Sequence, residues 1–131
     1  MPFSISPLLR AACLALLLGG CAVQQTATHM TPAPAGDAAE YILSTTVELR
    51  LNTGYQRSLR QGSRWLNVGR VPQGDVYKPY MDVFTVEGAH IHEAYLVVDS
   101  SQLVGFYLPA ERSYANLDQR VLLHFNSKGN Q

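Results

Sequence analysis

The clearest hydrophobic pattern in the chain is a pair of apolar runs in its C-terminal half. Ala94–Val98 and Leu103–Leu108 are rich in Val, Leu, Tyr and Phe, and Asp99–Gln102 separates them. These residue types fit a pleated strand, and Asp and Ser favour tight turns because their side chains hydrogen-bond the nearby backbone. The pattern predicts a β-hairpin, which Pro109 ends because proline has no N–H to donate.

Both faces of this predicted hairpin are apolar. In the first strand Tyr95 and Val97 point to one face. Ala94, Leu96 and Val98 point to the other. A strand with one face in water would alternate between apolar and polar residues. We therefore expect the hairpin to be covered on two sides, in the middle of a small β domain.

Shorter strands are predicted on either side of the hairpin, from period-two alternation or from apolar runs between turn residues. Tyr41–Leu43 is a candidate extension, towards the N-terminus, of the strand predicted at Thr46–Leu51. Glu87-Gly88 reads as a hairpin turn in which the glycine supplies a positive φ. The predicted strands are Thr46–Leu51, Arg64–Gly69, Asp75–Tyr77, Asp82–Val86 and Leu117–Phe125.

Two segments of the same region lack a strand pattern. Tyr55–Ser63 has Leu59 as its only aliphatic residue, so we expect a loop or an irregular edge there. Ala110–Asn116 reads as a loop in which Tyr114 lies over the core as an exposed lid.

The fold class follows from these elements. Six or seven short strands with tight turns, and no amphipathic helix after residue 40, indicate an all-β antiparallel meander. We expect it to close as a small barrel or a sandwich, because open sheet edges invite aggregation. The pattern leaves these two architectures open.

The N-terminal 20 residues have the pattern of an export signal. Arg10 and the α-amino group provide positive charge, and Ala11–Leu18 is an unbroken apolar run. A run this short is well under the roughly 20 residues that a transmembrane helix needs. We expect residues 1–20 to form a cleaved signal helix.

Leu18-Gly19-Gly20-Cys21 directly follows that run and resembles the lipobox of bacterial lipoproteins. The resemblance implies cleavage before Cys21, a diacylglycerol on its sulfur and an acylated new N-terminus. Several acyl chains hold a protein stably on a membrane, whereas one does not. Position 22 is Ala rather than Asp, so the resemblance implies the outer membrane of the cell envelope. An ordinary secretory signal and an uncleaved anchor are the alternatives.

The composition changes again after the cysteine. Residues 21–39 are Ala, Gln, Thr, Pro and Gly with few large apolar side chains, so we expect a flexible tether that carries the lipid anchor. The β domain then covers residues 40–126, and residues 127–131 form a frayed tail. The predicted β domain is similar to those of small envelope lipoproteins.

Charge and cysteine content limit the partners of this domain. The formal net charge is zero, so nucleic acid is not an expected partner. Neither cysteine is available for a disulfide, because Cys13 lies within the apolar run and Cys21 closes it. The domain must therefore be stable by packing alone.

The histidines are weak candidates for a metal site. His90 and His92 are spaced to project from one face of a strand, and His124 is the one further histidine in the domain. Zinc prefers three or four convergent ligands, so we assign neither a metal nor another cofactor to the domain.

The arginines point instead to a binding face. Arg57, Arg60 and Arg64 lie in a stretch without acidic residues, and guanidinium groups pair well with anionic groups. Tyr80 and Tyr114, beside predicted loops, are expected to be exposed and to join that face. The competing explanation is that the basic and acidic regions pair within the fold.

No catalytic motif accompanies these residues. Gly-x-Ser-x-Gly, His-Glu-x-x-His and a phosphate-binding glycine loop are all missing from the sequence. We therefore expect a lipid-anchored, non-enzymatic protein that binds another envelope component, either a protein or an anionic glycan or lipid. The alternative is a periplasmic hydrolase of peptidoglycan or a related glycan, which would need a carboxylate pair.

The anchor can be tested by metabolic labelling with a clickable fatty acid. Cys21→Ser should abolish both the label and the fractionation with membranes, because serine lacks the thiol that carries the lipid. Cys13→Ala, in the segment that we expect to be removed, is the control and should keep both. A Cys21→Ser protein that still carries label would contradict the anchor.

Overall fold

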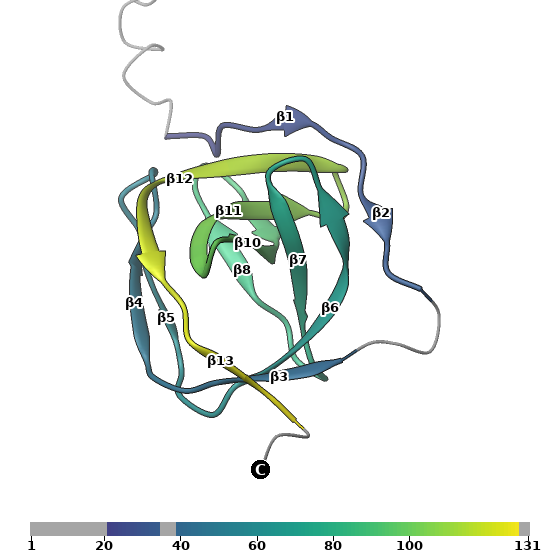
Figure 1. Cartoon of the computed structure of the whole chain (residues 1–131). Helices are drawn as coiled ribbons and strands as arrows, with labels where there is room; N and C mark the ends of the chain where they lie inside the picture. Colours follow the sequence, from purple (N-terminus) through teal and green to yellow (C-terminus); the bar gives the residue numbers. More distant parts are fainter. Residues whose placement is uncertain (1–20, 35–38, 129–131) are drawn as a thin grey trace, which may run out of the picture.

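The computed structural model describes residues 21–34 and 39–128, and all regular structure in them is β (Figure 1). The all-β, antiparallel prediction is confirmed. The strands are β1 (Thr26–Ala27), β2 (Thr31–Pro32), β3 (Glu40–Leu43), β4 (Val47–Arg50), β5 (Gln56–Leu59), β6 (Arg64–Val71), β7 (Gly74–Pro79), β8 (Thr85–Glu87), β9 (Ile91–Glu93), β10 (Tyr95–Asp99), β11 (Gln102–Leu108), β12 (Ser113–Leu122) and β13 (Phe125–Ser127).

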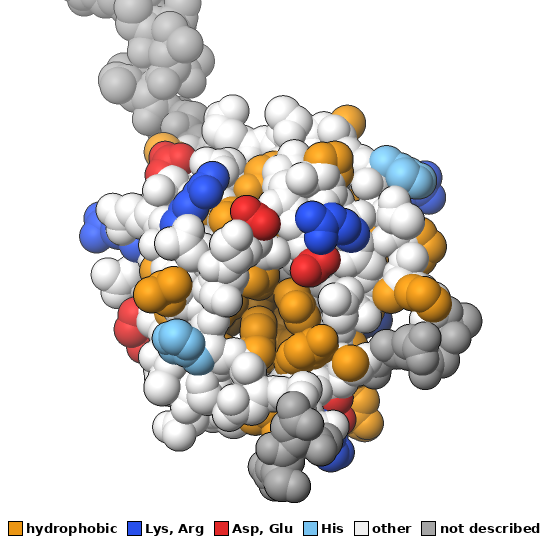
Figure 2. Space-filling model, in the orientation of Figure 1, with side chains coloured by type: hydrophobic (Ala, Val, Ile, Leu, Met, Phe, Trp, Pro, Cys, Tyr) orange, Lys and Arg blue, Asp and Glu red, His pale blue; other side chains and the backbone are white. Residues whose placement is uncertain are grey.

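Nine of these strands form the main sheet, in the order β1-β12-β11-β10-β7-β6-β3-β13, with β2 paired to β6. β4 and β5 form a separate hairpin, as do β8 and β9. The main sheet curls round the core (Figure 1), but its path is not closed by strand pairing within the described residues. The predicted closure as a barrel is therefore not found. Hydrophobic side chains are visible in a hollow between β13 and β7 (Figure 2).

The predicted hairpin is confirmed as β10 and β11, near the middle of the sheet. Asp99 pairs with Gln102, and the two central turn residues, Ser100 and Ser101, have φ values of 50° and 63°. Positive φ at both positions matches the right-handed twist of the flanking strands.

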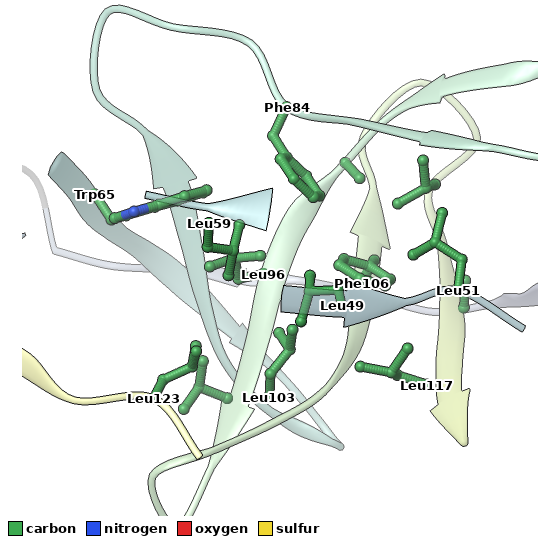
Figure 3. Packing of buried hydrophobic residues seen from close by; sticks show 14 of the residues in the cluster. Leu49, Leu51, Leu59, Trp65, Phe84, Leu96, Leu103, Phe106, Leu117 and Leu123 are labelled. Carbon is green, nitrogen blue, oxygen red and sulfur yellow. The ribbon is translucent and has the colours of Figure 1, made fainter. Parts of the chain in front are cut away.

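Both faces of this hairpin are buried, as the sequence predicts. A large cluster lies on one side and includes Leu96, Leu103 and Phe106 (Figure 3). A smaller cluster lies on the other side and consists of Val71, Val76, Val97, Val104, Tyr107 and Tyr114. The apolar side chains of the two strands therefore divide between two separate cores.

The segment predicted as a loop or irregular edge forms β5 instead. Its four residues pair with β4 in register, from Arg50 opposite Gln56 to Val47 opposite Leu59. The side chains of Arg57 and Leu59 point to the same face, so an arginine takes one of the two inward positions. Because this inward position holds an arginine rather than an apolar residue, the sequence of β5 does not show the period-two alternation of apolar and polar residues.

The last strands begin and end outside their predicted limits. β12 starts at Ser113, so Tyr114 lies within a strand rather than in a loop, and it is buried with 7% exposure. β13 extends to Ser127, and the Lys128 N–H donates to the Glu40 carbonyl at 2.9 Å. The predicted tail is therefore wrong for residues 127 and 128.

The prediction of a flexible tether is wrong for the described residues 21–34. β1 pairs with the edge of β12 and β2 pairs with β6. The Thr28 N–H donates to the Arg112 carbonyl at 3.1 Å, and the Ala33 N–H donates to the Val68 carbonyl at 2.9 Å. Backbone pairing of this kind needs no large apolar side chains, so the composition did not reveal it.

The signal peptide predicted for residues 1–20 lies outside the described residues. Within the described part of the chain, no helix has the length and apolar character needed to cross a bilayer.

The β10–β11 turn gives a direct test of the hairpin. Replacing Ser100-Ser101 with Asn-Gly should raise the free energy of unfolding by about 1 kcal/mol, because Asn and Gly accept positive φ with less strain. Urea unfolding followed by Trp65 fluorescence measures this change. Thr45→Gly, at an exposed bend without positive φ, is the control and should lower stability. Equal effects at the two sites would contradict the assigned turn.

Candidate functional site

Four of the five residues predicted to bind a partner lie together in one cleft of about 530 Å³. Arg57 comes from β5, Arg60 from the loop that follows it, Arg64 from the start of β6 and Tyr80 from the turn directly after β7. We call this site the arginine cleft; its lining also includes Trp65, Asp82, Val83 and Phe84. These four residues therefore line a single concave site.

The pairing of β6 with β7 brings two of these residues together. Trp65 lies opposite Pro79, and the Tyr80 N–H donates to the Arg64 carbonyl at 2.9 Å. Pro79 ends the ladder, and the chain then runs through residues 80–84 as a loop, so the predicted strand at residue 82 begins only at Thr85. That loop forms one wall of the cleft.

Arg57 is held by contacts on two sides. Its guanidinium lies 5.0 Å from the centre of the Phe84 ring, and its Nη1 is 3.6 Å from Glu87 Oε1. The arginine head group therefore stacks on an aromatic ring of the core. Its Nε is buried and has no hydrogen-bond partner among the described residues. Glu87 Oε2, on the carboxylate that pairs with Arg57, is likewise buried without a hydrogen-bond partner among the described residues.

Arg64 is also stacked and paired. Its guanidinium lies 4.5 Å from the centre of the Tyr80 ring, and its Nε donates to Glu40 Oε1. Lys128 Nζ lies 3.3 Å from the second oxygen of that carboxylate. The hydrogen bond from Arg64, with a smaller effect of Lys128, holds the pKa of Glu40 below its usual value of 4.5, and the same bond raises the pKa of Arg64.

The rim of the cleft combines one unpaired cation with exposed apolar groups. Arg60 is exposed and has no ion pair with a described residue. Val83 is 65% exposed, and Met81, in the same loop, is 89% exposed. Met81 also has a φ of 50°, a strained value for a residue with a side chain. Such strain is concentrated at binding sites more than elsewhere.

Tyr114 does not belong to the cleft, and the expectation that it is exposed is wrong. Its hydroxyl donates to the Val104 carbonyl at 2.9 Å within the smaller cluster. A Cβ added at Gly105 would collide with the Tyr114 ring, which therefore lies across this glycine. A glycine inside a buried strand is the sequence signal that could have located this contact.

The three candidate histidines do not converge. His90 lies in the β8–β9 turn rather than on the strand, and His92 Nδ1 contacts Glu111 Oε1 at 2.5 Å. His124 lies in the link between β12 and β13. Within residues 21–34 and 39–128, no three His, Cys, Asp or Glu side chains are grouped to hold a metal ion.

Cys21 lies at the other end of the β4–β5 hairpin, and its thiol is exposed. Its carbonyl accepts a hydrogen bond from the Ala89 N–H at 2.8 Å. A Cβ at Gly88 would come within 2.9 Å of that carbonyl oxygen, so this glycine is needed for close approach. Gly88 does not have the positive φ predicted for it.

Comparisons of the chain with family models, with curated proteins and with solved structures find no match. The site must therefore be interpreted from its own chemistry. Arginines stacked on aromatic rings, a buried unpaired N–H and an exposed apolar rim can receive a group that is part anionic and part apolar. Nothing in the local sequence around Val83 and Phe84 identified them as part of the site.

The Arg64–Glu40 pair makes a testable prediction. Arg64→Gln should raise the pKa of Glu40 towards 4.5, because the largest cause of its lowering is removed. In the unaltered protein the stabilisation from this pair is present above pH 4.5 and is lost as the pH falls through the lower pKa of the folded state. Carboxyl NMR titration measures the shift.

The matched control is Arg70→Gln, which removes a different exposed pair, with Asp75 at 3.0 Å. It should leave the Glu40 titration unchanged. An unchanged Glu40 pKa in Arg64→Gln would show that the pair does not form in solution.

Proposed function

We propose that this protein is a lipid-anchored component of the bacterial cell envelope whose non-enzymatic β domain binds an envelope protein through the arginine cleft. The observation that supports this most is the convergence of Arg57, Arg60, Arg64 and Tyr80, from separate strands and loops, on one concave site. Tyr and Arg are the residue types that contribute most to binding energy in protein interfaces.

The charges of the cleft favour a protein over an anionic glycan as the partner. Arg57 and Arg64 are already paired with Glu87 and Glu40, which leaves Arg60 as the unpaired cation of the lining. A polyanionic glycan would be better matched by several unpaired cations. An acidic side chain beside an apolar one matches Arg60 together with the exposed Val83.

The acidic content of the cleft favours binding over hydrolysis. Asp82 is the only carboxylate among the described residues that line it, and its Oδ1 accepts a hydrogen bond from the Val83 N–H at 2.8 Å. Glycoside hydrolysis in most families uses two carboxylates that flank the bond to be broken.

Membrane attachment is proposed through Cys21, on the basis of the lipobox resemblance. The exposed position of the Cys21 thiol is compatible with a bulky lipid on its sulfur. Cleavage before Cys21 and acylation of the new N-terminus would anchor the protein, and Ala rather than Asp at position 22 favours the outer membrane.

The binding proposal can be tested by crosslinking pull-down from detergent-solubilised envelopes. Tyr80→Ala should reduce partner recovery by about thirtyfold if the ring is a binding hot spot of about 2 kcal/mol. Arg60→Glu should also reduce partner recovery. The positive charge of Arg60, which pairs with no described residue, is then replaced by a negative one at the rim of the cleft. Arg50→Glu, on the exposed face of β4, is the matched control and should recover the partner fully.

Equal recovery by the Tyr80→Ala, Arg60→Glu and control proteins would refute a partner at the cleft. Recovery of glycan strands instead of a protein would support the anionic glycan. Digestion of purified sacculi by the wild-type domain, lost in Asp82→Asn, would support the hydrolase.

A further inference from the structure

Three segments meet at the end of the domain that carries Cys21. They are Cys21 itself, residues 51–55 between β4 and β5, and residues 88–91 at the β8–β9 turn. The Ala89 N–H donates to the Cys21 carbonyl, and the Thr53 hydroxyl donates to the Glu87 carbonyl at 2.5 Å. We call this surface the Cys21 pole.

The chain has no slack between Cys21 and the folded domain. An added Cβ at Gly88 would lie 2.9 Å from the Cys21 carbonyl oxygen and 3.0 Å from Val23 Cγ2, so the two segments are in direct contact. Farther along, β1 and β2 hold the chain on the edge of β12 and on β6. A flexible tether of 18 residues would reach about 25 Å. Here a lipid on Cys21 would start at the domain surface itself.

The Cys21 pole presents apolar groups to its surroundings. Tyr55 is 52% exposed and Ile91 is 73% exposed, and each adjoins a turn of the pole. Cys21 itself lines a pocket of about 260 Å³ whose apolar lining includes Leu51, Val86, Phe106 and Leu117. A dry cavity of about 150 Å³ already holds a benzene ring, so this pocket has room for a short stretch of hydrocarbon.

We infer that the Cys21 pole is a membrane-docking surface that rests on the bilayer, with Tyr55 and Ile91 in the headgroup layer. The inference rests on the proposed lipidation of Cys21, and it goes further because it assigns an orientation. Tyrosine suits such an interface, because its ring can lie in an apolar layer while its hydroxyl stays in water.

The orientation determines where the arginine cleft points. β4 leads to the Cys21 pole, and β5 returns from it to Arg60 at the cleft. In the core, Leu51 and Leu117 lie towards one end and Trp65 towards the other (Figure 3). A strand of four residues spans roughly 13 Å. A domain resting on the Cys21 pole therefore turns the cleft away from the bilayer, towards a partner in the periplasm.

The test uses the complete mature lipoprotein in vesicles of phosphatidylethanolamine and phosphatidylglycerol. Ile91→Cys introduces a reactive thiol while the sulfur of Cys21 carries lipid, and an environment-sensitive fluorophore is attached to it. Lipids with a nitroxide on the headgroup should quench most of this fluorescence. The matched control is Val83→Cys at the cleft, which is similarly exposed and should remain unquenched.

Gly88→Val provides a second measurement, because its side chain would displace Cys21 from the pole. Quenching at residue 91 should then fall to the level of the control although the protein still floats with the vesicles. Wild-type protein that fails to float would refute the anchor, and the docking inference with it. Protein that floats while residues 91 and 83 are quenched equally would overturn the docking surface and leave the anchor standing.

Discussion

The two-sided burial of the β10–β11 hairpin is the constraint on which the rest of the structure depends. Leu96 and Val97 are neighbours in sequence, yet both are fully buried, because they belong to different clusters on opposite faces of the sheet. A strand buried on both faces needs covering layers on each side. The β4–β5 and β8–β9 hairpins add residues to the large cluster, and Tyr114 and Met30 close the small one.

The β4–β5 hairpin also sets the distance between the arginine cleft and the Cys21 pole. Its turn helps form the Cys21 pole, and its far end supplies Arg57 and Arg60 to the cleft. Arg57 contributes to packing, since its guanidinium lies over the Phe84 ring, while its buried Nε has no hydrogen-bond partner among the described residues. A buried donor without a partner costs free energy, and a ligand that satisfies it recovers that cost on binding.

Several sequence-based expectations failed for reasons that lie in single residues. β5 was not predicted because an arginine holds one of its inward positions. Tyr114 was predicted as a surface lid, but its ring lies across Gly105 in the core. The prediction that residues 21–39 are flexible depends on their lack of large apolar side chains. Their described part is nevertheless held by backbone hydrogen bonds to strand edges. Composition reports side-chain burial and carries little information about backbone pairing.

By itself the sequence determined the all-β class and the central hairpin with its tight turn, because these depend on local periodicity and turn chemistry. A short motif also led to the prediction of a lipid on Cys21. The sequence also named three arginines and a tyrosine that share one site. Only the tertiary structure decided that these residues converge, that Tyr114 is excluded and that Cys21 contacts the β8–β9 turn. Each of these depends on which strands pair and in what register, and pairing between distant segments is set by the packing of the whole domain.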